Sequence, residues 1–525
     1  QPSVEKNDIF SFFDPTGVNP GAGGRLGRLA FAGTRWGAAS FGRRHPEFTY
    51  YKAFAPRLGF AYSWNAKTVV RGGYGIFFTQ AFYPGWEGGI STDGFNENVA
   101  FSSSLGGLQP AFILSQGFPQ NFTPPPFISP SALNGQGLNA ANNGGGDYRP
   151  FDANRLPYSQ QWNLTIEHQF TENFYISTAY VGNKGTRLPS TELPLNALDP
   201  KYLSMGSKLF DQFTPNSGQT SLDGVSIPYP GWIEQMKACS PTVAQALVPY
   251  PQYCSGILGL NENVGNSIYH SFQLKAEKRF ARGTSVLLAY TLSKLLTTSE
   301  DPQAFAQGVQ NGVMSPFQRE RNKSLAYDDV PQVLSVALIY QLPIGKGKRF
   351  LSQVGMLDKL VGGWEVTSIF RASSAIPFNF RNGQCNLPSQ FRAACVPALV
   401  PGASPFAQDL SNFDPSKPLF NSAAFEATGI LPGDVFNLGH GPRISNIRGF
   451  GFHNHDFGLT KDIPITERVH FEVRAEFFNI WNWHEFCGSG GSSSFNTDVS
   501  SASFGMWNGT ITPPRNIQVG GKITF

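Results

Sequence analysis

The chain has 525 residues, of which 14% are charged and 14% are aromatic, with 46 phenylalanines, 57 glycines and 39 prolines. Ordinary globular chains contain about 25% charged residues. No run of about 18 apolar residues occurs, which excludes transmembrane helices. The net charge of +4 is small and dispersed, which argues against a nucleic-acid partner. Strands with one lipid-facing and one water-facing side produce this balance of aromatic and polar residues.

Clear period-two alternation predicts β-strands. Trp162, Leu164 and Ile166 would share an apolar face, with polar residues between them. The same pattern recurs after the short polar turn at 171–173 and again around the turn at 281–283. Alternation alone fits either a soluble sandwich or a transmembrane barrel, so the connections between the strands must decide.

The pattern predicts eleven strands in chain order. They lie at 54–64, 68–78, 157–169, 174–182, 267–280, 284–295, 328–341, 363–376, 447–461, 467–481 and 515–525. Their connections alternate between short and long, with one of intermediate length at 342–362. Outer-membrane barrels have short periplasmic turns at one end and long extracellular loops at the other. We therefore predict an all-β, transmembrane antiparallel β-barrel with long extracellular loops.

The odd number of strands bears on how the barrel closes. Bacterial single-chain barrels have an even number, and an open edge in lipid leaves backbone groups unsatisfied. Either one strand is missed or the chain is half of a 22-stranded barrel, and we favour the half-barrel. The chain begins at Gln1 without a signal peptide, so we expect it to be processed or part of a longer protein.

Aromatic residues gather at the ends of the predicted strands, as in the girdles at membrane interfaces. They are Tyr158, Phe170, Phe174, Tyr269, Phe280, Tyr340, Trp364, Phe450, Trp481, Trp483 and Phe525. The alternative is that these are ordinary strand aromatics.

The five cysteines include two closely spaced pairs, Cys239 with Cys254 and Cys385 with Cys395, and Cys487 is left over. No C-x-x-C motif occurs, which disfavours a zinc or redox site. Two local disulfides in an oxidising compartment are the favoured interpretation. Free thiols in loops are the alternative.

No motif predicts an enzyme, a cofactor or a metal site. G-x-S-x-G, H-E-x-x-H and Walker motifs do not occur. Gly21–Gly24 lacks dinucleotide-loop spacing and follows no predicted strand, so we interpret it as a loop. His453 and His455 share a strand face, but Asp456 would point to the other face. We expect Asp328 and Asp329, at a strand mouth, to be solvated.

Two sets of residues suggest contacts with other molecules. Glu472, Arg474 and Glu476 share the polar face of one strand and predict an ion-paired ladder in the lumen that contacts a plug. Trp86 and Trp232 lie in predicted loops, where their rings would stack on a sugar or peptide ligand or pack the loop.

Several short stretches, in their order, resemble the Oar-like TonB-dependent outer-membrane receptors over essentially the whole chain. The stretches are Ala55–Tyr62, Val70–Phe77, Gln273–Phe280, Tyr290–Lys294, Leu342–Gly347, Gly362–Trp364, Asn437–Gly439, Arg474–Asn479 and Pro514–Gln518. The resemblance implies the C-terminal part of a 22-stranded barrel, with the carboxypeptidase-regulatory-like domain, the TonB-contacting segment and the plug absent from residues 1–525. It also implies that Phe525 is an assembly signal for the barrel-assembly machinery. The alternative for Phe525 is a lipid-facing strand end.

Two functions follow for an outer-membrane location. The first is TonB-driven uptake of a large ligand, such as an oligosaccharide, a peptide or a chelate, with TonB acting through the N-terminal part. The second is surface binding or adhesion, with the barrel anchoring large loops in outer-membrane lipid. The sequence does not name the extracellular ligand.

Overall fold

The fold is described from a computed structural model of the chain. The described residues are 11–35, 37, 40–44, 49–78, 102–117, 155–190, 194–236, 240–254, 256–257, 262–298, 314–345, 347–351, 360–381, 383, 385–426, 438–466, 468–486, 495–509 and 511–525.

One large antiparallel sheet dominates the structure. Its strand order is β16-β15-β14-β13-β12-β10-β9-β6-β5-β4-β3, and the short strand β11 pairs with β10 off this path. The strands are β3 (Arg57–Asn65), β4 (Thr68–Phe78), β5 (Tyr158–Thr171), β6 (Phe174–Ser190), β9 (Glu262–Ala281), β10 (Thr284–Thr297), β11 (Ser324–Leu325), β12 (Gln332–Gln341), β13 (Trp364–Ser373), β14 (Phe452–Pro464), β15 (His470–Phe478) and β16 (Asn516–Thr524). Each of the eleven predicted strands is present and pairs with the next predicted strand along the chain, whereas the short strand β11 was not predicted.

Smaller elements lie outside this sheet. They are the hairpins β1 (Ser11–Val18) with β2 (Leu26–Phe31) and β7 (Ser221–Leu222) with β8 (Val225–Ser226), and the short helices α1 (Trp232–Gln235) and α2 (Val243–Leu247). Short 3-10 helices occur at Pro20–Ala22, Leu105–Gly107, Leu114–Gln116, Pro200–Phe210, Arg319–Asn322, Ser389–Phe391, Leu410–Asn412 and Ser422–Ala424. Among the described residues, no helix is both long enough and apolar enough to cross a membrane.

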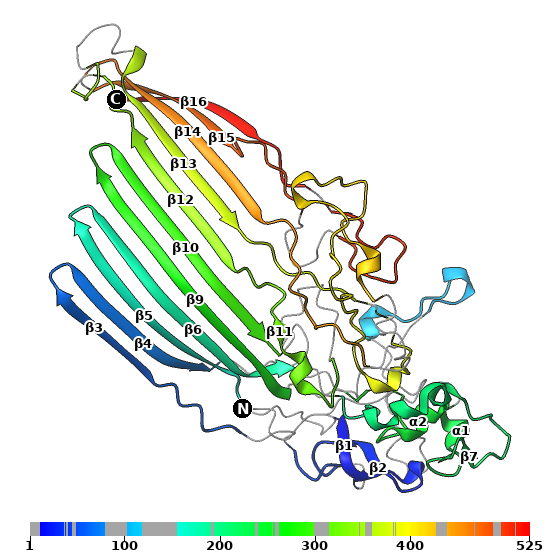
Figure 1. Ribbon diagram of the computed structural model, residues 1–525. Helices are drawn as coiled ribbons and strands as arrows, with labels where there is room; N and C mark the ends of the chain where they lie inside the picture. The colour runs from blue at the N-terminus through cyan, green and yellow to red at the C-terminus, as the bar shows by residue number, and fades with distance from the viewer. Residues whose placement is uncertain are drawn as a thin grey trace.

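The two ends of the large sheet differ sharply (Figure 1). At the turn end, two residues separate β3 from β4, β5 from β6, and β9 from β10. Arg282 and Gly283 form one of these turns with positive φ of 53° and 77°, the conformation that two-residue hairpins with matching strand twist require. The long connections all leave the other end, which we call the loop end. The predicted alternation of short and long connections is confirmed.

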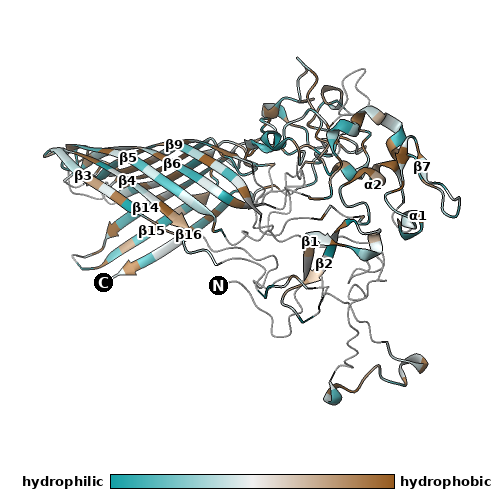
Figure 2. Cartoon of the chain, turned by 90° about the horizontal axis from the view of Figure 1, so that it is seen from below, coloured by the Kyte–Doolittle hydropathy of each residue, from teal (hydrophilic) through white to brown (hydrophobic). Residues whose placement is uncertain are grey.

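The register places alternate side chains on opposite faces, as predicted. Leu164 pairs with Gly72 and Tyr180, and Ile166 pairs with Val70 and Thr178. Directly paired residues in an antiparallel sheet point to the same face, so apolar side chains gather on one face. The sheet also curves rather than lying flat (Figure 2), as the wall of a barrel must.

Aromatic side chains mark the two ends of the strands. Trp64, Phe170 and Phe280 are exposed near the turn end, and Trp481 is exposed at the loop end. Between these two levels the apolar face carries aliphatic side chains such as Ile166, together with the directly paired Leu164 and Tyr180. This arrangement is that of an apolar band between two girdles.

The faces lead to a first prediction, on strand β5. Ile166→Arg places a charge in the middle of the apolar face and is expected to cost roughly 2–4 kcal/mol of stability near the bilayer midplane. Asn163→Arg, on the opposite face of the same strand, is the matched control and is expected to cost much less. Urea unfolding of the protein in lipid vesicles measures both variants. Equal losses would show that the two faces are assigned wrongly.

Some strands are much longer than a membrane requires. β9 has 20 residues and β6 has 17, whereas a crossing strand needs about 9–11. At about 3.3 Å per residue, β9 is roughly 65 Å long. The aromatic residues of the turn end mark the periphery of the apolar band on that side. The residues of β6 and β9 beyond the length of a membrane crossing therefore lie at the loop end, where they extend the wall beyond the membrane.

Candidate functional site

The loop-end connections fold together into a packed layer. We call it the cap and define it as the described residues within 11–35, 194–257, 375–447 and 495–509. These segments supply almost all the residues of three buried apolar clusters. Figure 1 shows the cap gathered beyond the loop ends of the strands.

The β1–β2 hairpin is part of the cap, and the sequence did not predict it. β3 runs from the loop end to the turn end, so the segment before it lies at the loop end. Gly21–Gly24 does follow a strand, contrary to the prediction, and links β1 to β2 with Gly23 and Gly24 at positive φ. The Asn19 side chain accepts a hydrogen bond from the Gly21 N–H at 3.1 Å and caps the short turn.

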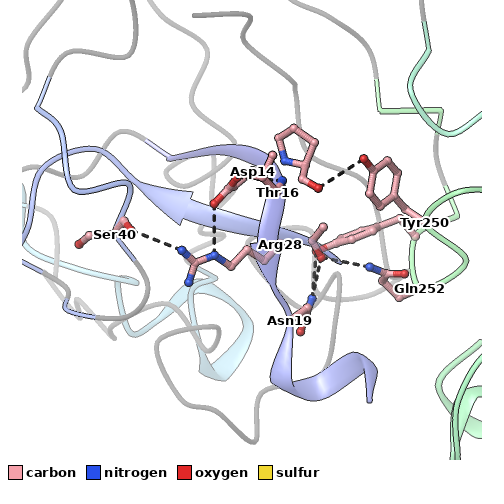
Figure 3. A network of polar contacts seen from close by, with 10 residues as sticks. Asp14, Thr16, Asn19, Arg28, Ser40, Tyr250 and Gln252 are labelled. Atoms are coloured by element: carbon pink, nitrogen blue, oxygen red, sulfur yellow. Dashed lines mark hydrogen bonds and ion pairs between the residues drawn. The ribbon is translucent and has the colours of Figure 1, made fainter. Parts of the chain in front are cut away.

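A polar network joins this hairpin to the connection between β6 and β9 (Figure 3). The buried amide of Gln252 donates to the carbonyls of Leu26 and Gly27 at 2.9 and 3.0 Å. Asn19 Nδ2 donates to the same Gly27 carbonyl at 3.1 Å. Gly27 has φ of 96°, and a Cβ there would lie 2.4 Å from the Tyr250 ring, so glycine is required. The hairpin is therefore fixed to a segment more than 200 residues away.

Within the hairpin an ion pair holds the two strands together. Arg28 Nε lies 3.4 Å from Asp14 Oδ2, and its Nη2 donates to the Ser40 carbonyl at 3.5 Å (Figure 3). Phe13 packs edge-on against the rings of Tyr250 and Tyr253. Polar and apolar contacts thus fix the hairpin in the same place.

Trp232 lies in the middle of the largest buried cluster. Its side chain is fully buried, and its indole N–H donates to the Pro251 carbonyl at 2.9 Å. Phe213 packs edge-on against it. Trp232 therefore packs the cap and presents no face to a ligand, which is the second of the two alternatives that the sequence left open for it. Trp86, the other predicted contact, lies outside the described residues.

A disulfide ring connects two of the long loops. Cys385 is bonded to Cys395, and we call residues 385–395, the ring that this bond closes, the finger. Phe391 within it is 2% exposed and belongs to the same cluster as Trp232 and Leu198. The finger thus inserts an aromatic side chain from the β13–β14 loop into the core of the β6–β9 loop.

Polar contacts surround this insertion. The Leu198 N–H donates to the Gln390 carbonyl at 2.7 Å, and Gln390 Nε2 donates to Gln245 Oε1 at 3.1 Å. Arg392 Nη2 donates to the Cys254 carbonyl at 2.6 Å, and burial lowers the pKa of its guanidinium. Cys254 is itself disulfide-bonded. Its predicted partner Cys239 and the leftover Cys487 lie outside the described residues.

A second cluster is built mostly from phenylalanine. Its buried members are Phe378, Phe380, Leu419, Phe420, Ala424, Phe425, Ile447, Phe495 and Phe504. Many of the rings meet edge to face, as Phe378 and Phe420 do at 4.9 Å between centroids, and such pairs add about 0.5–1.5 kcal/mol beyond their burial. This cluster fuses the β13–β14 loop with the β15–β16 loop.

Arginines fasten the cap to the strand ends. Arg448 Nη2 pairs with Asp329 Oδ2 at 2.5 Å, and Nη1 donates to the Asp329 and Ala375 carbonyls. Asp329 is buried and also accepts from the Leu295 N–H at 2.6 Å. The prediction that Asp329 is solvated is therefore wrong. Its partner Arg448 lies 119 residues away, in the segment just before β14. The buried Arg443 likewise donates to carbonyls of Asn322 and Thr297.

The two histidines of β14 take part in an aromatic and polar cluster. The Trp481 indole N–H donates to His455 Nδ1 at 2.9 Å, and His455 Nε2 lies 2.8 Å from Ser368 Oγ. An indole N–H only donates, so the His455 proton is on Nε2 and neither nitrogen remains for a metal. His453 Nδ1 lies 3.1 Å from Glu485 Oε1, and burial raises the pKa of that carboxyl. In the described part of the chain no group of three or more His, Cys, Asp or Glu side chains is placed to hold a metal ion.

The inner face of the sheet, opposite the apolar face, carries the predicted ladder residues. Arg474 lies between two carboxylates, with Nη2 at 2.7 Å from Glu472 Oε1 and Nη1 at 3.7 Å from Glu476 Oε1. Their contact with a plug stays a prediction. Phe525 is 97% exposed at the turn end of β16, and its role as an assembly signal also stays a prediction.

A second ion-paired group on the inner face was not predicted. Glu277 accepts from the Tyr175 hydroxyl at 2.6 Å and lies 3.0 Å from Lys275 Nζ and 3.5 Å from Arg279 Nε. The alternating charges of β9 are visible in the sequence, but Tyr175 comes from the neighbouring strand and only the register brings it there.

Comparison with known proteins places this architecture in a family. Residues 1–518 match the model of the outer membrane beta barrel domain. The chain belongs to this family and is a protein of the outer membrane. By the architecture of such barrels the loop end is extracellular and the turn end periplasmic. No curated protein matches the sequence.

Several solved outer-membrane receptors are similar in structure. They include the ferripyoverdine receptor of Pseudomonas aeruginosa (10% identity, TM-score 0.35, covering 90% of this chain and 32% of that one). The ferric-catecholate import receptor Fiu of Escherichia coli K12 has 7% identity and a TM-score of 0.34, with 89% and 34% covered. The ferric preacinetobactin receptor BauA of Acinetobacter baumannii has 8% identity and a TM-score of 0.34, with 90% and 36% covered. The chain spans about a third of the length of each.

Proposed function

We propose that this chain forms half of the wall and much of the extracellular cap of a TonB-dependent receptor that takes up a large ligand. An oligosaccharide, a peptide and a metal chelate are the candidate ligand classes. The observation that carries the proposal is a sheet whose main path of eleven strands ends in two open edges, with a folded cap at one end. The resemblance of the sequence to Oar-like receptors supports the same function.

The open edges are the first part of the argument. β3 and β16 end the strand order, and every residue of both strands is exposed. Within the described residues no pairing joins these two strands. Unsatisfied backbone groups in lipid cost several kcal/mol each, so both edges require further strands. Eleven more would give a 22-stranded barrel, the size of the plugged outer-membrane transporters.

The cap is the second part of the argument. A general porin needs an open mouth, whereas here the long loops pack into buried clusters joined by a disulfide. A folded surface above a wide lumen suits capture of a large ligand before uptake. The packed cap also favours a second candidate function, surface binding or adhesion with the barrel as an anchor.

Two measurements on the protein extracted from outer membranes test the proposal. Its intact mass is expected near twice the 57.3 kDa of this chain, and it is expected to bind the purified C-terminal domain of TonB, with a porin from the same membranes as the negative control. A mass of 57.3 kDa would contradict the half-barrel. A large mass without TonB binding would favour the adhesion function.

A further inference from the structure

Three basic side chains lie together on the apolar face of the sheet. Lys294 of β10 is the direct partner of His270 of β9, and His270 is the direct partner of Gly182 of β6. Lys184 follows Gly182 by two residues and therefore points to the same side of the sheet. Directly paired residues share a face, so the three side chains project from the lipid-facing side of three neighbouring strands (Figure 1).

The height of these side chains corresponds to the outer surface of the membrane. His270 lies ten residues from Phe280 at the turn end of β9, and Lys184 lies ten residues from Phe174 on β6. At about 3.3 Å per residue and a strand tilt of about 40°, ten residues rise about 25 Å, which is the height of the apolar band of an outer-membrane barrel. Because the turn end is periplasmic, the basic side chains lie level with the headgroups of the outer leaflet.

A bulge in β6 adds a fourth cation to this face. The pairing of β6 with β9 shifts between Thr186 and Leu188 and skips Arg187, whose φ is 56°. This left-handed conformation is unfavourable for residues other than glycine. The Arg187 guanidinium lies over the Tyr158 ring, with 5.9 Å from Cζ to the centroid, and Tyr158 is the direct partner of Thr186 on the apolar face. The bulge therefore turns Arg187, which regular alternation would point into the lumen, towards the lipid side.

Aromatic side chains position His270 and leave one of its ring nitrogens for another partner. The Tyr180 hydroxyl lies 2.7 Å from His270 Nδ1 and so engages that nitrogen. Trp162 meets the imidazole edge-on, at 6.2 Å between centroids. The Trp162 ring can lie this close because its neighbour is Gly182, where a Cβ would be 2.3 Å from the ring. His270 Nε2 is therefore available to a molecule outside the wall.

We call Lys184, Arg187, His270 and Lys294 the basic patch. In the described strands from β4 to β10, no aspartate or glutamate occupies the apolar face at this height. The neighbouring positions on that face are Tyr74, Ile76, Gln160, Ile268, Leu292 and Leu296. Closer to the turn end, Phe272 is 45% exposed and its direct partner Leu292 is 46% exposed. The complement of this surface is a molecule with an anionic head and an apolar tail.

We propose that the basic patch binds the phosphate groups of an outer-leaflet lipid, whose acyl chains lie along the apolar side chains below it. Lysine and arginine form strong charge-assisted hydrogen bonds to phosphate, and basic groups at a membrane surface attract anionic headgroups. The patch spans two strand spacings, about 10 Å, and about 17 Å along β6, which is room for more than one phosphate. The site goes beyond the proposed function and is compatible with both uptake and adhesion.

Binding of diphosphorylated lipid A to the intact protein tests this site. The protein is extracted from outer membranes, freed of lipid in detergent and titrated with lipid A, and native mass spectrometry measures the complex. Lys184→Gln, Arg187→Gln and Lys294→Gln together are expected to lower the affinity at least about tenfold, because each cation near a membrane surface contributes to headgroup binding. Unchanged affinity would overturn the proposal.

A control variant loses the same charge elsewhere. Lys201→Gln, Lys208→Gln and Lys417→Gln replace three exposed lysines of the cap and are expected to leave the affinity unchanged. An equal loss would show that net charge, rather than the basic patch, binds the lipid, and would overturn the proposal. Lys184→Arg with Lys294→Arg keeps both charges and is expected to retain binding, which separates loss of the site from loss of the fold.

The chemistry of the lipid gives a second test. Lipid A without phosphates is expected to bind the unmodified protein at least about tenfold more weakly than the diphosphorylated form, and to bind the triple glutamine variant of the patch no more weakly than the unmodified protein. Equal binding of both lipids to the unmodified protein would overturn the proposal. Displacement of lipid A by an equal concentration of inorganic phosphate would assign the patch to a free anion and would also overturn it.

The bulge provides a variant that preserves the backbone. Arg187→Gly is expected to weaken binding of diphosphorylated lipid A about fivefold, the contribution of one cation at a membrane surface. Its unfolding midpoint in detergent is not expected to fall, because glycine adopts a positive φ without strain. Unchanged lipid affinity would contradict the proposal, since the bulge would then turn Arg187 towards the lipid side without any effect on binding.

Discussion

Replacing Phe391 by alanine is expected to separate the two largest loops of the cap while the barrel wall stays folded. Phe391 is 2% exposed within the cluster that includes Trp232 and Leu198. Removal of a buried phenylalanine side chain typically costs about 3–5 kcal/mol. Hydrogen exchange is expected to rise throughout 194–254 and 385–395, because the finger and the β6–β9 loop share this core.

The control for this variant is Phe210→Ala. Phe210 lies in the β6–β9 loop, whose core Phe391 enters, but is 47% exposed, so its removal is expected to change exchange little. Trypsin cleavage of the folded protein gives a second readout of the same loosening. If Phe391→Ala and Phe210→Ala gave the same exchange rates in 194–254, the finger would not hold the loops together.

Replacing Asp329 by alanine is expected to be the other large loss of stability. Removal of one partner from a buried ion pair leaves an uncompensated charge and typically costs about 3–5 kcal/mol. Here Arg448 would lose the Asp329 carboxylate, and the Leu295 N–H would lose its acceptor. The thermal unfolding midpoint of the protein in detergent is expected to fall clearly.

An exposed ion pair of the same cap supplies the comparison. Asp414 and Lys417 lie 3.0 Å apart, with side chains 40% and 69% exposed, so Asp414→Ala is expected to change the unfolding midpoint much less than Asp329→Ala. A double variant, Asp329→Ala with Arg448→Met, removes both charges and is expected to recover part of the loss. No recovery would indicate that the hydrogen bond to the Leu295 N–H, rather than the buried charge, carries the effect.

Much of the wall could be predicted because the membrane imposes a simple rule on it. A strand such as β5 meets lipid on one face only, so Trp162, Leu164 and Ile166 recur with period two. The rule fails beyond the bilayer. β6 continues to Ser190, eight residues past the predicted end at 182, because residues 183–190 have no lipid-facing side to mark them.

The cap could not be predicted because its order comes from contacts between distant segments. Trp232 begins the four-residue helix α1 and Phe391 ends a three-residue 3-10 helix, and elements this short leave no periodic pattern in the sequence. Only the tertiary structure shows that both side chains enter one core. The hairpin β1–β2 contains Pro15 and depends on Gln252 and Tyr250 for its position. Asp329 shows the same difficulty, since a charged residue at a strand mouth carries no local sign of a buried partner such as Arg448.

The finger has a mechanical consequence for the barrel rim. It ties the loop between β6 and β9 to the loop between β13 and β14, and so passes over β10 and β12. This contact fixes the distance between the loop ends of β6 and β9 and those of β13 and β14. The curvature of the wall between them, which includes β10 and β12, can then no longer change freely. The mouth of the barrel is thus held at constant width along this arc. A large solute must then enter past its other side or move the braced loops together as one rigid body.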